Sequence, residues 1–347
     1  MVSAAHGQLR KAGLDDDTIK ALKSPDEELL ISDLEWLDHD SHHLVTWSDE
    51  RYPPLLKDIP SPPAALFVEG NPDLLWLPQV AVIGSRNPTA GGRDNARDFA
   101  TELSRHGMAI TSGLASGIDS VAHQAALDSD NPTVAVMGTG LDRIYPASSR
   151  NLALSIRQKG VLVSELPLGT GVRRSHFPSR NRIISGLSLG VFVIEAGLRS
   201  GTLITARLAA NQGREVFALP GSIHNPMAKG CHRLIRDGAK LVESVEEILS
   251  ELAPMAGQLA EELKSQFELQ PVDGEVVSLD SGSRDPQLDD DPDYQVLWAC
   301  LGHDPKPIDA IIEQSGLTAR AVSAMLLLLE LRGKVEAHSG GAYSRKK

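Results

Sequence analysis

The sequence predicts an α/β protein built around a doubly wound parallel sheet, with a small helical domain before the sheet and a small winged-helix domain after it. Three observations lead to this fold class. Between residues 78 and 250, six short apolar runs alternate with helix-like stretches. Aromatic residues make up only 4% of the chain, so Ala, Val, Ile and Leu must form the core, which suits parallel α/β structure. The length of 347 residues is sufficient for two domains or three small ones.

Residues 1–70 are expected to form a helical domain followed by an extended connection. Three short helices are predicted within residues 1–42, and two of them start at acidic residues, Asp15–Asp17 and Asp26-Glu27, which favour the N-terminal end of a helix dipole. The proline-rich stretch 51–63 is expected to run extended, because each proline restricts its own backbone and that of its predecessor.

Residues 71–252 are expected to form the sheet domain. The predicted strands are the apolar runs 80–85, 108–113, 133–138, 161–166, 190–196 and 215–221, and the predicted helices are 91–106, 117–128, 148–159, 181–188, 201–212 and 228–237. Continuous apolar strands separated by helices indicate a parallel sheet that is covered on both faces. A doubly wound sheet of this kind places its binding site at the carboxyl ends of the strands.

The last two regions are predicted from composition and from helix-like patterns. Residues 253–292 are read as an acidic flexible linker, since residues 251–293 hold 12 acidic and only 2 basic residues. Residues 293–347 contain three helix-like stretches and two short strands around residues 339–341, which is a winged helix-turn-helix pattern.

The charge of the chain is unevenly distributed. The net charge of −12 argues at first against a nucleic-acid partner, which normally requires a basic surface. However, residues 138–214 hold 11 basic residues and 3 acidic residues, whereas residues 1–70 hold 6 basic and 14 acidic residues. The basic window covers the ends of several predicted strands and indicates an anion-binding surface.

Several classes of protein are disfavoured by the sequence. Two cysteines are too few for a disulfide scaffold and suit a reducing cytoplasm. No apolar run reaches the ~18 residues of a membrane span, and the first residues do not resemble a signal peptide. We expect no metal, because His224, Cys231 and His232 do not have a ligand spacing. We also expect no dinucleotide cofactor, because the first strand-end turn reads G-S-R-N-P-T and lacks the usual glycine fingerprint.

Small and polar residues follow the predicted strands at the edge where a ligand is expected. Such turns allow backbone N–H groups to approach an anion, and the following helix N-terminus adds positive potential. The alternative is that glycine is needed there only to make tight turns. The residues in question are Gly84, Ser85 and Arg86, then Ser112, Gly113 and Gly117, and finally Ser200, Gly201 and Thr202.

The densest basic cluster surrounds Phe177. Arginines interleaved with an aromatic ring that can stack on a base are typical of proteins that bind single strands. The alternative is that Phe177 is a core residue and that some arginines form ion pairs with Glu165 or Glu195. At least one of the arginines, Arg182 for example, is expected to be structural. The arginines are Arg173, Arg174, Arg180 and Arg182.

Seven ordered motifs over residues 44–242 are very similar to the bacterial DNA-processing protein A (DprA, or Smf) family. They are VAVIGSR, SGLASGID, GLDRIYP, SELPLG, FPSRNRIISGLS, EAGLRSGTLITA and GREVFALPG. The N-terminal helices resemble the SAM-like domain of many members, the sheet domain resembles their Rossmann-like core, and the tail resembles their winged-helix domain.

This resemblance implies a non-enzymatic cytoplasmic protein that binds and protects single-stranded DNA, forms a homodimer and loads RecA recombinase during natural transformation. On the family's motifs, Arg86 is the arginine of GSR, Arg174 is the basic residue before FP, and Phe177 is the aromatic residue of FPxRNR. Arg150 matches a basic position after the family's YP, although Ser149 replaces the usual asparagine.

Two catalytic alternatives remain open. The segment from Glu195 to Thr202 is also similar to the nucleotide-binding loop of phosphoribohydrolases of the lysine-decarboxylase-like family, which would make the protein a nucleotide-processing enzyme. Those enzymes carry a catalytic glutamate on the following helix, where this chain has no acid before Glu215, and this favours binding over catalysis. A Ser/His/Asp arrangement of Ser85, His123 and Asp119 is disfavoured because no nucleophile elbow is present.

Overall fold

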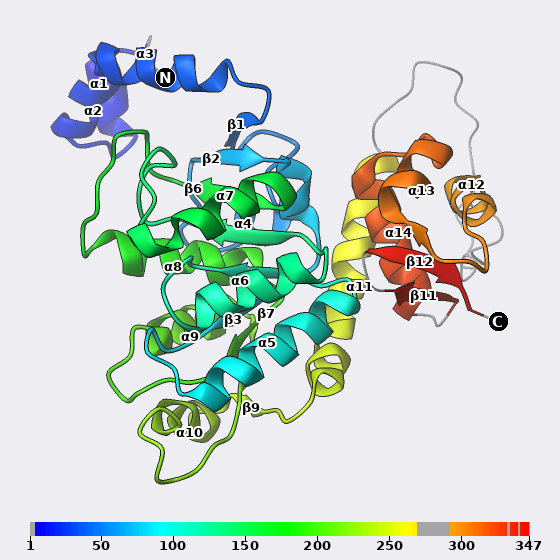
Figure 1. The fold of residues 1–347 in the computed structure, drawn as a ribbon. Coiled ribbons are helices and arrows are strands. Elements are labelled where there is room, and N and C mark those ends of the chain that lie inside the picture. Colours follow the sequence, from blue (N-terminus) through cyan, green and yellow to red (C-terminus); the bar gives the residue numbers. More distant parts are fainter. Residues whose placement is uncertain (1–3, 269–291, 332–333, 339–340, 347) are drawn as a thin grey trace.

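A nine-stranded sheet lies at the centre of the protein (Figure 1). The computed structural model describes residues 4–268, 292–331, 334–338 and 341–346. The strand order is β1-β2-β6-β5-β4-β3-β7-β8-β9. The strands are β1 (His42–Thr46), β2 (Ala65–Gly70), β3 (Gln79–Ile83), β4 (Ala109–Ser112), β5 (Thr133–Val136), β6 (Val161–Ser164), β7 (Gly190–Val193), β8 (Glu215–Ala218) and β9 (Lys240–Leu241).

The sheet confirms the predicted doubly wound architecture. All neighbouring strands from β6 through β9 are parallel, whereas β2 pairs antiparallel with both β1 and β6. The six predicted strands are all present, and every residue of β3 to β7 is buried. Burial on both faces explains why these strands read as continuous apolar runs instead of alternating ones.

Helices cover both faces of the sheet. One face packs against α5 (Ala90–Arg105), α6 (Ile118–Asp128), α7 (Arg150–Lys159) and α11 (Val245–Glu268). The other packs against α4 (Pro54–Lys57), α8 (His176–Leu187), α9 (Thr202–Asn211) and α10 (Lys229–Arg236). Two 3-10 turns complete this part, η1 (Pro72–Trp76) and η2 (Ala147–Ser149). The core therefore lies in two aliphatic layers, as the low aromatic content predicts.

The strand order changes direction next to β3. From β3 the chain adds β4, β5 and β6 on one side, and it then crosses back to place β7 on the other side. In register, Val82 of β3 faces Phe192 of β7. Such a switch point opens a crevice at the carboxyl ends of the two strands, because their following loops diverge there. The site is therefore expected where β3 and β7 end.

The N-terminal region differs from its prediction in one respect. The helices α1 (His6–Lys11), α2 (Asp16–Lys23) and α3 (Glu27–Leu37) are present, and Asp15 and Asp26 cap the second and third. The segment expected to be an extended connection instead contributes β1, α4 and β2, so the sheet extends to the edge formed by residues 42–46. The prolines do not prevent this, because Pro54 occupies the first turn of α4, where its missing N–H is not needed.

The acidic segment after the sheet begins as a helix, which corrects the expected flexible linker for residues 253–268. These residues belong to α11, which continues through Pro254 to Glu268. Leu252, Ala256 and Leu259 are buried against α5 and the sheet, so apolar spacing of three to four residues outweighs the acidic composition. Residues 269–291 of the expected linker lie outside the described residues.

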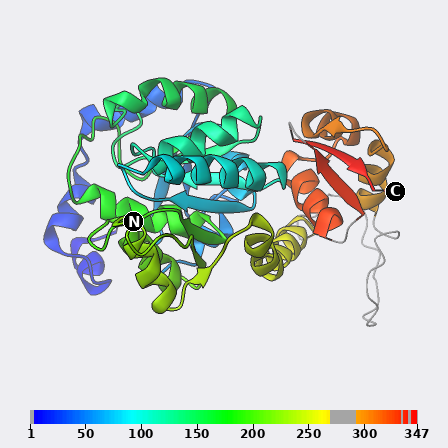
Figure 2. The same ribbon diagram turned by 60° about the horizontal axis from the view of Figure 1, so that its bottom comes forward.

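The C-terminal winged helix confirms its prediction. It contains α12 (Pro292–Cys300), α13 (Ile308–Ser315) and α14 (Ala319–Leu331), with β10 (Lys306–Pro307), β11 (Val335–His338) and β12 (Ala342–Arg345). The short strand β10 was not expected and pairs with β12. Figures 1 and 2 both show this domain beside α11, and α14 contacts that helix. No helix within the described ranges is both long and apolar enough to cross a membrane.

Candidate nucleic-acid interface

An open cavity of about 570 Å³ lies at the predicted crevice, between the carboxyl ends of β3 and β7. Its lining includes eight of the residues singled out from the sequence: Gly84, Ser85, Arg86, Phe177, Arg180, Ser200, Gly201 and Thr202. Residues from the strand-end loops, from α8 and from the start of α9 thus meet around one space. Parallel strand ends that lie on the same edge produce this convergence.

Two strand-end turns interlock beneath the cavity. Gly117 has a φ of +88°, and a Cβ there would lie 2.3 Å from the carbonyl oxygen of Ser85. A Cβ on Gly84 would likewise lie 2.6 Å from the Ile118 side chain. The backbone N–H of Ile118 donates to the Ser85 carbonyl at 3.1 Å. Both glycines are therefore required by close packing between the turns, which is the tight-turn alternative left open by the sequence.

Arg86 and Phe177 come together at the rim of the cavity. The guanidinium carbon of Arg86, an exposed residue, lies 5.7 Å from the centre of the Phe177 ring. The ring rests on Gly138, where a Cβ would be 3.1 Å away, and its centre lies 5.7 Å from that of the half-exposed Tyr145 ring. Phe177 is only half-buried, so it is a surface aromatic residue. The pair offers a positive charge and a ring surface side by side.

Arg150 and Arg174 lie at the same edge of the sheet and are both exposed. Arg150 begins α7, after the loop that follows β5, and the preceding Ser149 donates its hydroxyl to the Leu114 carbonyl at 3.1 Å. Arg174 lies two residues before α8 begins, next to the exposed Arg173. These side chains do not line the cavity, and they extend the basic surface outward from it.

Arg180 is not an exposed phosphate ligand, which corrects the expectation for this residue. Its side chain is buried at 5% exposure, and its guanidinium donates to the carbonyls of Gly113, at 2.8 Å, and Val136. Burial lowers the pKa of Arg180 to about 10, although the nearby Asp119 carboxylate acts to raise that pKa. The residue therefore holds α8 against the ends of β4 and β5.

Arg182 is likewise a structural residue. Its guanidinium forms a two-bond ion pair with Glu165, in which the Nη1 bond is 2.8 Å long, and it also donates to the Ser61 carbonyl at 2.8 Å. This is one of the pairings that the sequence left open for the basic cluster. It corrects the inclusion of Arg182 among the DNA-facing residues, because both ends of its guanidinium are already engaged.

The turn after β4 is not the anion cradle that the sequence predicts. The N–H groups of Gly113 and Ala115 donate to the carboxylate of Asp119, at 3.2 and 3.3 Å. The hydroxyl of Ser112 is buried and donates to the Val82 carbonyl at 2.7 Å. Desolvation raises the pKa of Asp119, although Arg180 opposes this. A protein carboxylate therefore occupies the place expected for an external anion.

The start of α9 is tied to the end of β3. The hydroxyl of Thr202 donates to the Gly84 carbonyl at 3.0 Å, and that of Ser200 donates to the Thr202 hydroxyl at 2.9 Å. Gly201 is exposed, and a Cβ there would meet nothing within 4 Å. These three residues thus shape one wall of the cavity. The hydroxyls of Ser200 and Thr202 already donate hydrogen bonds within the protein.

The Ser/His/Asp arrangement is absent at Ser85, His123 and Asp119. The Nδ1 of His123 bonds to the Thr133 hydroxyl at 2.7 Å, whereas Ser85 donates to the sulfur of Met227 at 3.5 Å. Burial lowers the pKa of His123 to about 3, so this imidazole is neutral. The three side chains do not form the hydrogen-bonded chain that nucleophilic catalysis requires.

Sequence reasoning missed several residues of the cavity wall. Asn87, Asn181, Arg199, Ile204 and Met227 also line it. Arg199 is exposed and precedes Ser200, so its charge in a strand-end loop was a usable signal. Met227 carries no such signal, because it reaches the cavity only through the fold of the loop before α10.

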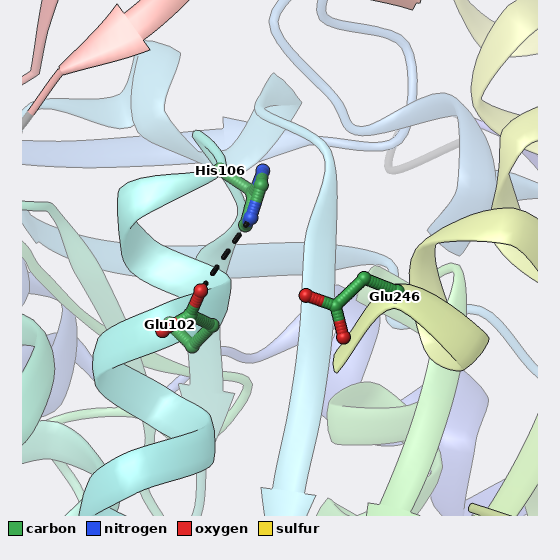
Figure 3. A group of neighbouring side chains, drawn as sticks. All are labelled: Glu102, His106 and Glu246. Atoms are coloured by element: carbon green, nitrogen blue, oxygen red, sulfur yellow. Dashed lines mark ion pairs between the residues drawn. The ribbon is translucent and has the colours of Figure 1, made fainter. Parts of the chain in front are cut away.

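A surface cluster of Glu102, His106 and Glu246 lies away from this cavity (Figure 3). Figure 3 shows Glu102 on α5, His106 at the C-cap of that helix and Glu246 on the first turn of α11. Their ligand-type atoms lie within 4.8 Å of one another, and His106 forms an ion pair of 3.8 Å with Glu102. All three side chains are partly or fully exposed, and Arg105 also pairs with Glu102 at 3.6 Å. The ion pairs of this cluster lie at the end of α5, and we assign them to surface ion pairing.

Two family models match the chain. Residues 43–253 match the model described as DNA recombination-mediator protein A, and residues 282–341 match the DprA winged helix domain. The first match covers the whole sheet from β1 to β9. Its start agrees with the structure, which places β1 in the sheet and not in a separate N-terminal unit.

Curated relatives and solved structures agree with these matches. The chain is 42% identical to Protein Smf of Escherichia coli over 96% of this chain and 85% of that protein. It is 40% identical to DNA processing protein DprA of Streptococcus pneumoniae over 70% and 96%. The X-ray structure of the pneumococcal protein superposes with a TM-score of 0.66 at 38% identity, covering 72% of this chain and 87% of that one.

A second solved structure is that of DNA processing protein A from Helicobacter pylori, described for its single-stranded DNA binding mode. It matches with a TM-score of 0.56 at 29% identity, covering 62% of this chain and 97% of that one. The family model spans more than half of the residues, and the Escherichia coli relative extends over nearly all of them. By its sequence and its fold, this chain belongs to the DNA recombination-mediator protein A (DprA/Smf) family.

Proposed function

We propose that the protein binds single-stranded DNA across the carboxyl edge of its sheet. The observation that carries this proposal is the pairing of the exposed Arg86 with the half-buried ring of Phe177 at the rim of an open cavity. A guanidinium forms strong bonds to a phosphate, and an aromatic ring stacks on a base of any sequence. The Helicobacter pylori relative, which is described as binding single-stranded DNA, supports the same ligand.

The proposed path of the strand extends beyond the cavity. Arg150 and Arg174 are exposed on the same edge and supply further phosphate contacts. Arg199, which sequence reasoning did not select, also lines the cavity and adds a second exposed guanidinium to that of Arg86. Arg180 and Arg182 support this surface from below through their bonds to the protein. Phosphate contacts of this kind give affinity without base sequence preference.

Family membership supports a cellular role in DNA processing and recombination. We propose that the protein protects incoming DNA and loads RecA recombinase onto it during natural transformation and recombination. We further propose that it acts as a homodimer in the cytoplasm. The names of the relatives and the family description support DNA processing and recombination mediation. DNA protection, RecA loading and the homodimer are proposed on the motif resemblance to the family.

Binding is favoured over the nucleotide-processing alternative by the positions of the acidic groups. The helix α9, which follows the nucleotide-binding-like loop, contains no Asp or Glu. The carboxylate of Glu195 is buried at 6% exposure and accepts hydrogen bonds from Thr89 and Asn225. A general acid or base must be free to reach a substrate, and neither position provides one.

The proposal is tested by fluorescence anisotropy with labelled oligo-dT. Arg86→Ala should weaken binding, whereas Arg97→Ala should leave it unchanged. Arg97 is a matched control, because it is an exposed arginine on α5 whose guanidinium pairs with Asp94 at 3.0 Å, away from the cavity lining. Absence of oligo-dT binding in the unmodified protein, or equal affinity of both variants and the parent, would refute the proposal.

A further inference from the structure

The carboxylate of Glu195 lies beneath the loop that carries Arg86. Glu195 follows β7 by two residues, is 6% exposed and receives its hydrogen bonds from neutral donors. Its Oε2 accepts from the Thr89 backbone N–H at 2.9 Å. Its Oε1 accepts from the Thr89 hydroxyl at 2.6 Å and from the Asn225 side-chain amide at 3.3 Å. The end of β7 is thereby bonded to the loop after β3 and to the loop before α10.

The protein is built to hold a charge at this position. Thr89 is the N-cap of α5, a helix of 16 residues, so the carboxylate lies at a helix N-terminus whose dipole stabilises negative charge. Gly92, in the first turn of the same helix, leaves the space that the carboxylate fills. A Cβ on Gly92 would lie 2.5 Å from the Glu195 carboxyl carbon. The site therefore needs glycine at one position and a carboxylate at the other.

These contacts fix the short loop from Gly84 to Thr89 at both ends. Gly84 is held by the Thr202 hydroxyl and by packing against Ile118, and Thr89 is held by Glu195. Inside the loop, the Asn87 backbone N–H donates to the Ser85 hydroxyl at 3.1 Å. Arg86 has an exposed side chain on a loop whose ends are both fastened. Preorganisation of this kind lowers the entropy cost of binding.

The second loop held by Glu195 borders the same cavity. Asn225 accepts a hydrogen bond from the Met227 N–H at 2.9 Å, and the Met227 carbonyl accepts one from the Ala196 N–H at 2.7 Å. Met227 lines the cavity and receives the hydroxyl of Ser85 at 3.5 Å. One buried carboxylate thus joins the two loops on either side of the proposed binding surface.

We infer that Glu195 is a positioning residue for nucleic-acid binding: it holds the 84–89 and 222–227 loops so that Arg86 is presented beside Phe177. This inference rests on the proposed function. It also predicts that removing Glu195 changes DNA affinity in the direction opposite to the one expected from electrostatics alone. Removal of a negative charge near a phosphate-binding surface strengthens binding if charge alone matters, whereas loss of a positioning group weakens it.

The test is a double-mutant cycle on oligo-dT affinity. Glu195→Ala should weaken binding roughly tenfold, which corresponds to the loss of one or two buried hydrogen bonds. In the background of Arg86→Ala the same substitution should have little further effect, because Glu195 acts through the loop that carries Arg86. Glu195→Gln retains an acceptor for the Thr89 N–H and should lose less affinity than Glu195→Ala.

Two further variants separate positioning from charge and from folding. Asp98→Ala removes an exposed acid from α5 and should leave affinity equal or slightly higher. Asn225→Ala removes the longest of the three bonds to Glu195 and also the side-chain acceptor of the Met227 N–H. It should weaken binding in the same direction if Glu195→Ala does not fold. Circular dichroism melting of each variant verifies that the titrated protein is folded.

The outcomes distinguish this inference from the proposed function. If the parent binds oligo-dT and Arg86→Ala weakens it, but folded Glu195→Ala binds equally or more tightly, the positioning role is wrong and the proposed function stands. Additive losses in the double variant also contradict the positioning role, because they show an effect that does not pass through Arg86. If the parent does not bind oligo-dT, both proposals fail.

Discussion

The guanidinium carbon of Arg86 lies 5.7 Å from the centre of the Phe177 ring, and this pair joins the loop after β3 to the first turn of α8. The two residues are 91 positions apart in the chain and meet only because the parallel sheet brings β3 beside β7 and places α8 over the edge. The pair combines the two kinds of contact that a single strand offers, a phosphate and a base face.

Phe177→Leu should weaken binding to oligo-dT by roughly 1–3 kcal/mol, the usual worth of one base stacked on an aromatic ring. Leucine keeps an apolar contact with Gly138, so the variant should remain folded while it loses the ring. Anisotropy titration measures the loss. Affinity equal to that of the parent would show that the ring is a packing residue only.

Arg174→Ala and Arg182→Ala should differ in what they change. Loss of the exposed Arg174 should reduce the steepness of the log affinity–log salt plot by about 0.7, the value for one phosphate contact on a single strand. Loss of Arg182 should lower the melting temperature and leave that slope unchanged, because its guanidinium is bound to Glu165. A reduced slope in the Arg182 variant would return this residue to the DNA surface.

Arg180→Ala should be strongly destabilising. The variant leaves the Asp119 carboxylate buried without its neighbouring cation and leaves the Gly113 and Val136 carbonyls without a donor. Breaking a buried pair in this way typically costs about 3–5 kcal/mol. Urea unfolding followed by circular dichroism measures the cost. A loss below about 1 kcal/mol, the size expected for an exposed ion pair, would be inconsistent with the buried geometry.

Glu330 should make stability depend on pH. Burial raises the pKa of this α14 carboxyl to about 7 from the ordinary 4.5, although Lys346 opposes the shift. The folded state therefore retains a proton that the unfolded state has released. The contribution of the Glu330 carboxyl to the free energy of unfolding is greatest below pH 4.5. It decreases as the pH rises to about 7 and is constant at higher pH. The buried Tyr343 lies close to the Glu330 carboxyl. Gly107 packs against both side chains, because a Cβ there would lie 2.9 Å from the Tyr343 hydroxyl and 3.9 Å from the Glu330 carboxylate.

Glu330→Gln tests this dependence, because glutamine does not titrate. Melting temperatures of the full chain at pH 5.5 and pH 8 should fall with rising pH in the parent, and the fall should be smaller in the variant. Identical pH dependence in the two proteins would assign the effect to other groups.

Much of the fold could be predicted because strands β3 to β7 are buried on both faces, β8 is partly buried, and all six runs carry an apolar signal. The edge strands β1 and β2 were missed, since prolines nearby are typical of extended loops and the helix between the two strands, α4, has only four residues. The helical course of residues 253–268 was missed because the acidic composition of that segment was given more weight than the spacing of Leu252, Ala256 and Leu259.

The position of the site could be predicted from the sequence, but the residues that form it could be predicted only in part. Parallel strands place their following loops on one edge, so the cavity at Gly84 and Gly201 follows from topology. Individual roles depend on side-chain partners that are distant in sequence. Nothing local distinguishes the exposed Arg174 from the buried Arg180, whose partners are carbonyls of β4 and β5 loops. Asp119, considered from the sequence as a member of a disfavoured Ser/His/Asp arrangement, instead accepts hydrogen bonds from the backbone N–H groups of Gly113 and Ala115.

The central claim is that the carboxyl edge of this sheet binds single strands through Arg86. The most direct measurement is a competition titration between oligo-dT and a duplex of the same length, over a range of salt, with the parent and with Arg86→Ala. The account predicts tighter binding of the single strand, a negative log–log slope of about 0.7 per phosphate neutralised, and weaker binding in the variant for every sequence. Tighter binding of the duplex, or an affinity that Arg86→Ala does not change, would contradict it.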